Sequence, residues 1–241
     1  MQVDSNAIIR LNNNIEAVNP SDNSFEIMED VKTSNSTFEM KETVNPGNIS
    51  LGEVKNRHLY VMLSMTGTPL SRAIRFSTKE PYSHCSISLD RELHEMYSFG
   101  RLIKWTMIFA GLVHEVPDRN VYRLYEHTLC AIYEVDVTEE QYKEAKEYLK
   151  RLWNRRKYLS YNTPGLVLAR FNRYPAIPNS YYCSQFVGLV LQHIGVNFTE
   201  KNYRAVRPND FRNNPNLKLV YEGELRDYWN MYCISDGFTP Y

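Results

Sequence analysis

The chain has 241 residues, of which 43% are hydrophobic and 23% are charged, which is enough apolar material for one sizeable core. The composition excludes a disulfide-rich miniprotein and a wholly disordered chain. Twenty-eight basic and 28 acidic side chains cancel, so the charge favours no nucleic-acid partner. No stretch reaches the roughly 18 to 20 apolar residues of a membrane helix, and we see no secretion signal. We expect a cytoplasmic protein without stable membrane insertion.

The first 54 residues differ from the rest in composition and charge. They contain nine Asn, no Tyr and no Trp, and their net charge is −6 against +6 for the remainder. Such a segment buries too little apolar surface to offset the entropy of ordering its chain. We therefore expect residues 1–54 to form an acidic extension that is disordered or loosely docked, and residues 55–241 to form one domain.

The domain opens with strand and helix signals. Residues 59–65 form an apolar run of strand length. Thr68 followed by Pro69 is typical of a helix N-cap with proline in the first turn. We expect a helix there, and on one side it carries three basic residues, Arg72, Arg75 and Lys79.

Strand signals fill the middle of the chain. Residues 83–89 and 93–99 flank a short segment, 90–92, and this spacing suits a β-hairpin. Two further strands are expected over 121–125 and 130–137.

Two helices are expected in the second half. Thr138 and Gln141 form a capping box, and apolar residues at helical spacing continue to about Arg156. Residues 179–194 carry a second apolar stripe, and Gly195 follows as a stop signal.

The cysteines narrow the possible chemistry. The four are far apart and form no C-x-x-C motif; they are Cys85, Cys130, Cys183 and Cys233. The sequence therefore predicts no metal site, no cofactor and free thiols in a reducing compartment.

Cys183 is the candidate nucleophile. It lies near the start of the 179–194 helix, where unpaired backbone N–H groups and the helix dipole stabilise a thiolate. A nucleophilic thiol also needs a base, and His84 on a strand with small neighbours is the best candidate among six histidines. His193 is excluded because ten helical residues separate it from Cys183 by roughly 15 Å. The alternative interpretation is a buried structural cysteine.

The third residue of the site depends on the hairpin turn. With a two-residue loop, Glu95 on the next strand shares the face of His84 and can orient the imidazole. A three-residue loop reverses the parity and offers His94 or Ser98 instead. Cys85, next to His84, is expected to point to the opposite face, into the core.

These residues carry a family resemblance over roughly residues 58–229. The relevant segments are TGTPLSRAIRFSTKEPYSHCSISLD, ELHEMYSFGR, GLVHE, NSYYCSQFVGLVLQHIG, RPNDF and YEGELRDY. Together they resemble the YiiX-like group of permuted NlpC-type cysteine peptidases in the papain-like superfamily. In that group a strand histidine comes first, a polar residue on the next strand follows, and the helix cysteine comes last. The resemblance implies that Cys183 is the nucleophile, His84 the general base and Glu95 the third residue.

The resemblance also implies a fold and an activity. The fold is α+β, with an antiparallel, partly barrel-like sheet and the cysteine-bearing helix packed on it. The activity is thiol-dependent hydrolysis of an amide or other acyl bond in a small-molecule, peptide or acyl substrate, through an acyl-enzyme. One alternative is an acyltransferase or lipid hydrolase of the lecithin–retinol acyltransferase type, with residues 105–110 as a hydrophobic lip. The other is a non-catalytic binding module on the same fold. The sequence leaves the substrate and the oligomeric state open.

Overall fold

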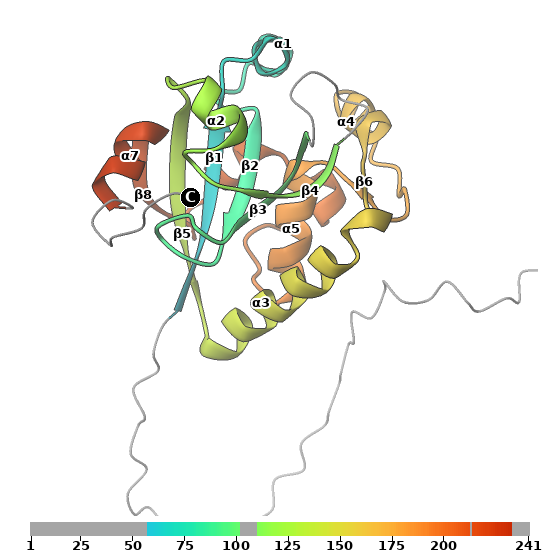
Figure 1. Ribbon diagram of the computed structural model, residues 1–241. Coiled ribbons are helices and arrows are strands. Elements are labelled where there is room, and N and C mark those ends of the chain that lie inside the picture. Colours follow the sequence, from blue (N-terminus) through green and yellow to red (C-terminus); the bar gives the residue numbers. More distant parts are fainter. Residues whose placement is uncertain (1–56, 102–109, 213, 233–241) are drawn as a thin grey trace, which may run out of the picture. The chain divides into compact units, whose positions relative to one another are not determined.

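The structure is a computed structural model that describes residues 57–101, 110–212 and 214–232 (Figure 1). The chain divides into two units, 1–47 and 48–241, and all described residues belong to the second. The extension predicted over residues 1–54 lies outside the described residues, as does the predicted lip except for Ala110.

Six antiparallel strands form the central sheet, in the order β4-β3-β2-β1-β5-β8. Their bounds are β1 (Arg57–Met65), β2 (His84–Ser88), β3 (Met96–Arg101), β4 (Ala110–Glu115), β5 (Leu129–Val137) and β8 (Lys218–Glu224). Strand β1 is buried from its third residue onward. Its apolar run has no polar alternation because protein covers both faces of the sheet at this position.

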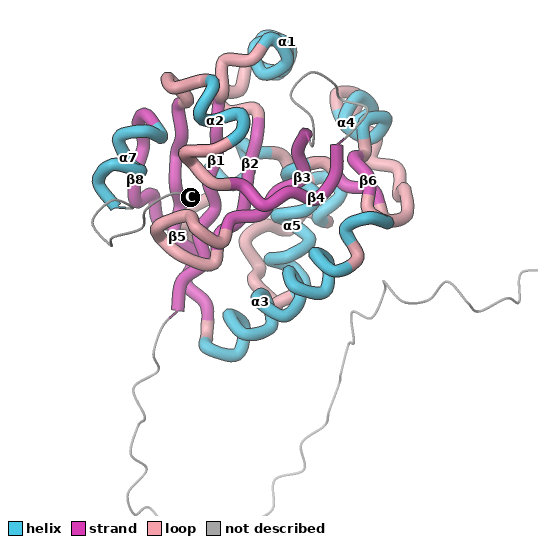
Figure 2. Tube along the Cα trace, in the orientation of Figure 1, coloured by secondary structure: helices cyan, strands magenta, loops and turns pink. Residues whose placement is uncertain are grey.

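Helices and short turns connect and flank these strands (Figure 2). The helices are α1 (Pro69–Thr78), α2 (Asn120–Leu124), α3 (Glu139–Asn154), α4 (Thr163–Ala169), α5 (Cys183–His193), α6 (Pro208–Arg212) and α7 (Leu225–Tyr232). Two 3₁₀ turns, η2 (Arg156–Tyr158) and η3 (Tyr203–Ala205), and a small parallel pair, β6 (Ser160–Tyr161) with β7 (Ser180–Tyr181), complete the description. Within these ranges, no helix is both long and apolar enough to cross a bilayer.

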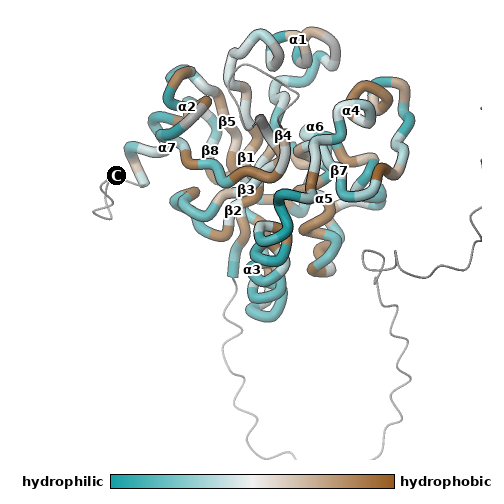
Figure 3. Tube along the Cα trace, turned by 45° about the vertical axis from the view of Figure 1, so that its right-hand side comes forward, coloured by the Kyte–Doolittle hydropathy of each residue, from teal (hydrophilic) through white to brown (hydrophobic). Residues whose placement is uncertain are grey.

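Each face of the sheet has its own core. Helices α3 and α5 pack on one face, where Leu149 and Phe186 join β-strand residues such as Val61. Helices α2 and α7 contribute Tyr122 and Tyr228 to a smaller core on the other face. Figure 3 shows α3 as largely hydrophilic, since only one side of this helix is buried. The expected class, helices packed on an antiparallel sheet, is confirmed.

The local signals for helix ends are confirmed. The Thr68 hydroxyl accepts a hydrogen bond from the Ser71 backbone N–H at 3.1 Å, and the capping box of Thr138 and Gln141 is formed. Gly195 follows α5 with a φ of 75°, a conformation that glycine adopts without strain. Two polar cap residues and one glycine were therefore enough to predict where α1 and α3 begin and where α5 ends.

Two predictions about elements are corrected. Residues 121–125, predicted as a strand, lie mainly in the single-turn helix α2. Five residues are too few to distinguish the helical from the strand period, and β-branched and aromatic side chains favoured the strand prediction. The second predicted helix begins at Cys183 and not at Asn179, because Ser180 and Tyr181 form β7.

Candidate active site

The start of α5 places Cys183 in the first helical position. Tyr182 before it is extended, with a φ of −99° and a ψ of 169°, and serves as the N-cap. The first-turn backbone N–H groups have no acceptor within the helix and give this end a positive dipole. The Cys183 side chain is buried, with 4% of the residue exposed. The predicted position of this thiol at a helix start is confirmed.

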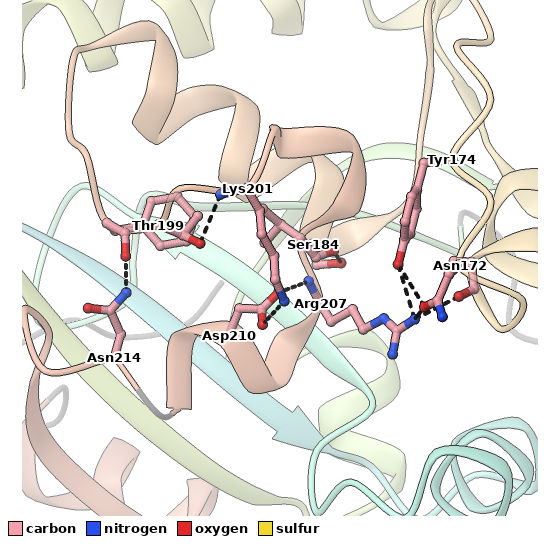
Figure 4. A network of polar contacts seen from close by, with 11 residues as sticks. Asn172, Tyr174, Ser184, Thr199, Lys201, Arg207, Asp210 and Asn214 are labelled. Carbon is pink, nitrogen blue, oxygen red and sulfur yellow. Dashed lines mark hydrogen bonds and ion pairs between the residues drawn. The ribbon is translucent and has the colours of Figure 1, made fainter.

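Hydrogen bonds to η3 and to the residue that follows it hold the start of α5 in place. The Ser184 hydroxyl donates to the Val206 carbonyl at 2.6 Å, and the Tyr182 hydroxyl donates to the Arg204 carbonyl at 2.9 Å. Arg207 continues this network: its guanidinium donates to the Asn172 side-chain oxygen at 2.9 Å (Figure 4). These contacts fix the first turn of α5 relative to the chain around α4.

A split between two strands lies beside the cysteine. Strand β2 pairs with β3 only at Ile87 and Ser88 among the described residues, although β3 continues to Arg101 alongside β4. His84 and Cys85 therefore lie in the part of β2 that is not paired with β3. Strand geometry directs their side chains to opposite faces of the sheet. This opening explains how His84 can interact with Cys183, which lies in the core on the Cys85 side.

A carboxylate from β4 holds the histidine. Glu115 Oε1 lies 3.1 Å from His84 Nε2, and the hydroxyls of Ser86 and Tyr122 donate to Glu115 Oε2 at 2.6 and 3.1 Å. Glu115 must reach across β3 to make this contact. The carboxylate and imidazole side chains are only 11% and 21% exposed.

The electrostatics favour an ion pair between thiolate and imidazolium. Burial alone would lower the pKa of His84, but the Glu115 carboxylate and Cys183 outweigh burial and raise it to about 10. The Cys183 pKa is held well below its usual value by hydrogen bonding from Cys85 and by His84, against burial. Burial would raise the Glu115 pKa, yet the charge and hydrogen bond of His84 lower it. Since Nε2 of His84 is occupied by Glu115, Nδ1 is the ring nitrogen left for Cys183.

Glu95 is not the residue that contacts His84. The connection between β2 and β3 spans residues 89–95, longer than either loop considered from the sequence, and the register pairs Ile87 with Tyr97. This register places Glu95 on the opposite parity to His84. The Glu95 side chain is exposed and lies 3.8 Å from Lys146 Nζ. The predicted contact is wrong because the loop length, and with it the strand parity, was misjudged.

The other two candidates for the third residue, Ser98 and His94, lie in different parts of the structure. Ser98 shares the parity of His84, is fully buried and helps to lower the pKa of Glu115. His94 lies in the loop before β3, with its ring edge-on to Trp229 at 5.7 Å between ring centroids. Neither residue replaces Glu115 as the carboxylate partner of the imidazole. Sequence reasoning missed Glu115, although the segment GLVHE was noted, because the pairing of β3 with β4 is a long-range contact.

The remaining sequence candidates lie apart from this constellation. His193 stacks on Tyr148 with ring centroids 3.7 Å apart and contacts Glu144, as expected for a residue at the far end of α5. Cys85 is buried in the core, as predicted. Cys130 belongs to the core on the other face, and Cys233 lies outside the described residues.

One group of residues has the side chains of a metal site. The ligand atoms of His58, Glu134 and Asp136 lie within 4.8 Å of one another. His58 lies near the start of β1, whereas Ser64, which pairs with His84, lies near the end of this strand. Glu134 is already paired with Lys218 Nζ at 3.0 Å, and the Asp136 side chain is 77% exposed. An ordinary cluster of ion pairs on a protein surface has the same arrangement.

Comparison of the chain with protein-family models, with curated proteins and with solved structures finds no match. The functional argument therefore rests on the geometry of the site.

Proposed function

We propose that the protein is a cysteine hydrolase that cleaves an amide or other acyl bond, with Cys183 and His84 as its catalytic pair and Glu115 as the residue that positions His84. The observation that carries the proposal is the buried contact between Glu115 and His84, together with a thiol at a helix start, Cys183, that helps Glu115 to raise the His84 pKa. A structural cysteine has no need of a charged imidazole beside it or of a carboxylate held by two hydroxyls. The order His84, Glu115, Cys183 along the chain also supports the permuted papain-like fold suggested by the sequence resemblance.

The geometry supports a two-step mechanism. The Cys183 thiolate attacks the acyl carbon, and the carbonyl electron pair moves onto oxygen, where first-turn backbone N–H groups of α5 stabilise the oxyanion. His84 gives its proton to the leaving amine or alkoxide as the tetrahedral intermediate collapses to a thioester. It then takes a proton from water, whose oxygen attacks the thioester and releases the acid and the thiolate. Glu115 stabilises the imidazolium throughout.

An acyl-transfer experiment tests the proposal. The full chain is mixed with p-nitrophenyl acetate, and the bound acetyl group is located by intact mass and peptide mapping. We expect a burst of p-nitrophenol and one acetyl group on Cys183, because a thioester intermediate forms before hydrolysis. Cys183→Ala should lose both signals, whereas Cys130→Ala, which removes a thiol from the other core, should keep them. Acetylation that persists in Cys183→Ala would contradict the assignment.

A cavity beside the site favours acyl substrates that carry a negative charge as a second candidate. Its volume is about 590 Å³, and Met65, which contacts the Ser83 hydroxyl next to His84, is part of its wall. The wall combines apolar side chains such as Phe76 with basic ones, and the latter are Arg72, Arg75, Lys79 and His127. Figures 1 and 3 show α1 and α4 at the same end of the sheet, and exposed apolar side chains of α4 include Val167. A lipid-like anionic acyl donor fits this combination.

Charge reversal on α1 separates the two candidates. Arg75→Glu should raise the KM for an anionic acyl thioester on the order of 10-fold and leave the KM for its neutral methyl ester unchanged, since only the former interacts with the cationic wall. Lys150→Glu, on the exposed side of α3, is the matched control. Equal effects of Arg75→Glu on both substrates would contradict an anionic substrate while leaving the hydrolase proposal intact.

A further inference from the structure

Exposed apolar side chains gather around α4. Ten large apolar side chains are exposed in the part of the chain that the structure describes, and five of them lie between residues 158 and 177. These five are Tyr158, Val167, Leu168, Phe171 and Ile177. The two ends of this stretch lie side by side, because β6 pairs with β7 through Ser160 and Ser180. Single exposed apolar residues are ordinary, whereas a group of this size marks a surface of interaction.

The charged residues in this part of the chain are all basic. Residues 155–178 contain no Asp or Glu, although the whole chain has as many acidic as basic side chains. The five basic residues of the stretch are all exposed, and they are Arg155, Arg156, Lys157, Arg170 and Arg173. The surface around α4 therefore combines apolar side chains with positive charge from its own residues.

Helix α1 repeats this combination at the same end of the sheet (Figures 1 and 3). Phe76 is 89% exposed. The charged residues of α1 and its C-cap are all basic and exposed, and they are Arg72, Arg75 and Lys79. The same mixture of apolar and basic side chains thus occurs on two elements that are far apart in the sequence.

Hydrogen bonds hold the backbone that carries the exposed side chains of α4. At the start of this helix the Asn162 side-chain oxygen accepts from the Gly165 backbone N–H at 2.8 Å, and its side-chain nitrogen donates to Gln185 at 3.3 Å. After the helix, the Arg207 guanidinium donates to the Ala169 carbonyl at 2.8 Å and also to Asn172 (Figure 4). The apolar side chains are therefore presented to solvent by a backbone that is fixed on both sides of α4.

We propose that the α1–α4 face, which consists of α1 and residues 155–178, docks on the surface of an anionic lipid bilayer. The basic side chains pair with the negative lipid headgroups, and the apolar side chains enter the boundary between headgroups and acyl chains. Apolar and basic side chains on one face are the combination that binds such a surface without spanning it. The proposal goes beyond the hydrolase activity and does not depend on it.

Two other partners fit this face less well. A nucleic acid would use the basic residues and could stack on Phe171, but it offers little apolar surface to the aliphatic side chains of Val167 and Leu168. A second copy of the chain, docked through the same face, would bring like charges together. The bilayer surface is the partner that uses both the charge and the aliphatic side chains.

Sedimentation of the full chain with lipid vesicles tests the proposal. Vesicles of phosphatidylcholine and phosphatidylserine in equal amounts should bind the protein at least about 10-fold more tightly than vesicles of phosphatidylcholine alone, and added salt should weaken this binding. Arg173→Glu and Phe171→Ser should each weaken binding to the anionic vesicles on the order of 10-fold, the first by charge and the second by lost apolar contact. Lys150→Glu on α3 and Met231→Ser on α7 are the matched controls and should bind as the wild type, since both residues are exposed outside this face.

Three results would overturn the proposal. They are equal sedimentation of the wild type with both kinds of vesicle, binding that Phe171→Ser leaves unchanged, and tighter binding to a single-stranded RNA oligonucleotide than to the anionic vesicles. The first and third are read from the wild-type chain, so they do not depend on the folding of a variant. Sedimentation needs no substrate, and neither Phe171 nor Arg173 lines the cavity beside α1. Docking can therefore fail while the hydrolase proposal stands, and the reverse also holds.

Discussion

At the scale of single residues, the carboxylate behind His84 has the largest influence on the candidate site. Glu115 is held by three donors, and it opposes the burial that would otherwise keep the imidazole neutral. Without a charged imidazole, the buried Cys183 sulfur would lose a main source of its low pKa. Glu115 is therefore a positioning residue that acts on the thiol through His84.

Replacement of this carboxylate should weaken both catalysis and the charge on His84. Glu115→Gln should reduce turnover by roughly 10- to 10⁴-fold, the range expected when the orienting group of such a triad is lost. It should also lower the pKa of His84, which a purely structural role would not do, and NMR titration of the His84 ring protons measures this value. Glu95→Gln is the matched control, since Glu95 contacts Lys146 at the surface and should leave both quantities unchanged. An equal loss in Glu95→Gln would restore the assignment made from the sequence.

The same groups predict how stability depends on pH. The folded-state pKa of His84 is raised to about 10 from 6.5, so its contribution is fully present below pH 6.5 and is lost as the pH rises through about 10. The folded-state pKa of Glu115 is lowered, so its contribution is present above its usual value of 4.5 and is lost as the pH falls below it. Urea unfolding across this range should show both losses, and Glu115→Gln should weaken both. A wild-type profile that is unchanged in Glu115→Gln would contradict the coupling.

At the scale of elements, the sequence predicted which segments form the site but not how they pair. The strand of His84 and the helix of Cys183 were found because each has a strong local pattern: small residues around His84, and an apolar stripe followed by Gly195. The partner Glu115 was missed because two long-range choices had to be known. One is the parity across the seven residues between β2 and β3, and the other is the register between β3 and β4. Neither follows from a local signal.

A hydrogen bond in the first turn of α5 should contribute to the stability of the fold. Ser184 is 1% exposed, and its hydroxyl satisfies the buried carbonyl of Val206. Ser184→Ala leaves this carbonyl without a donor and should lower the free energy of unfolding by about 1–3 kcal/mol. Tyr158→Phe removes the hydroxyl of a side chain that is 64% exposed and should change it by less than about 0.5 kcal/mol. Chemical denaturation of both variants checks this, and equal stabilities would show that the contact does not hold the helix start.

At the scale of the whole molecule, the family resemblance implied an antiparallel sheet with helices packed on it, and the structure confirms this class. Neither the resemblance nor the local patterns predicted that the site lies at a split in this sheet. At this split α5 packs against β2 and β3, a tertiary arrangement that brings Phe186 against Phe99 with ring centroids 5.2 Å apart. Tertiary packing of this kind overrides local propensity, and this is why the candidate nucleophile and base could be named while their geometry could not.

The central claim is that Cys183 is a thiolate at neutral pH and that His84 helps to keep it so, and the pH dependence of its alkylation tests this most directly. Iodoacetamide labelling of the full chain, followed site by site by peptide mass, should modify Cys183 faster than Cys85, Cys130 or Cys233. Its rate should be constant around pH 7 and fall only in acid, since the Cys183 pKa is well below its usual value. His84→Ala should move this fall to higher pH. Equal labelling of all four cysteines, or a profile that His84→Ala leaves unchanged, would contradict the claim.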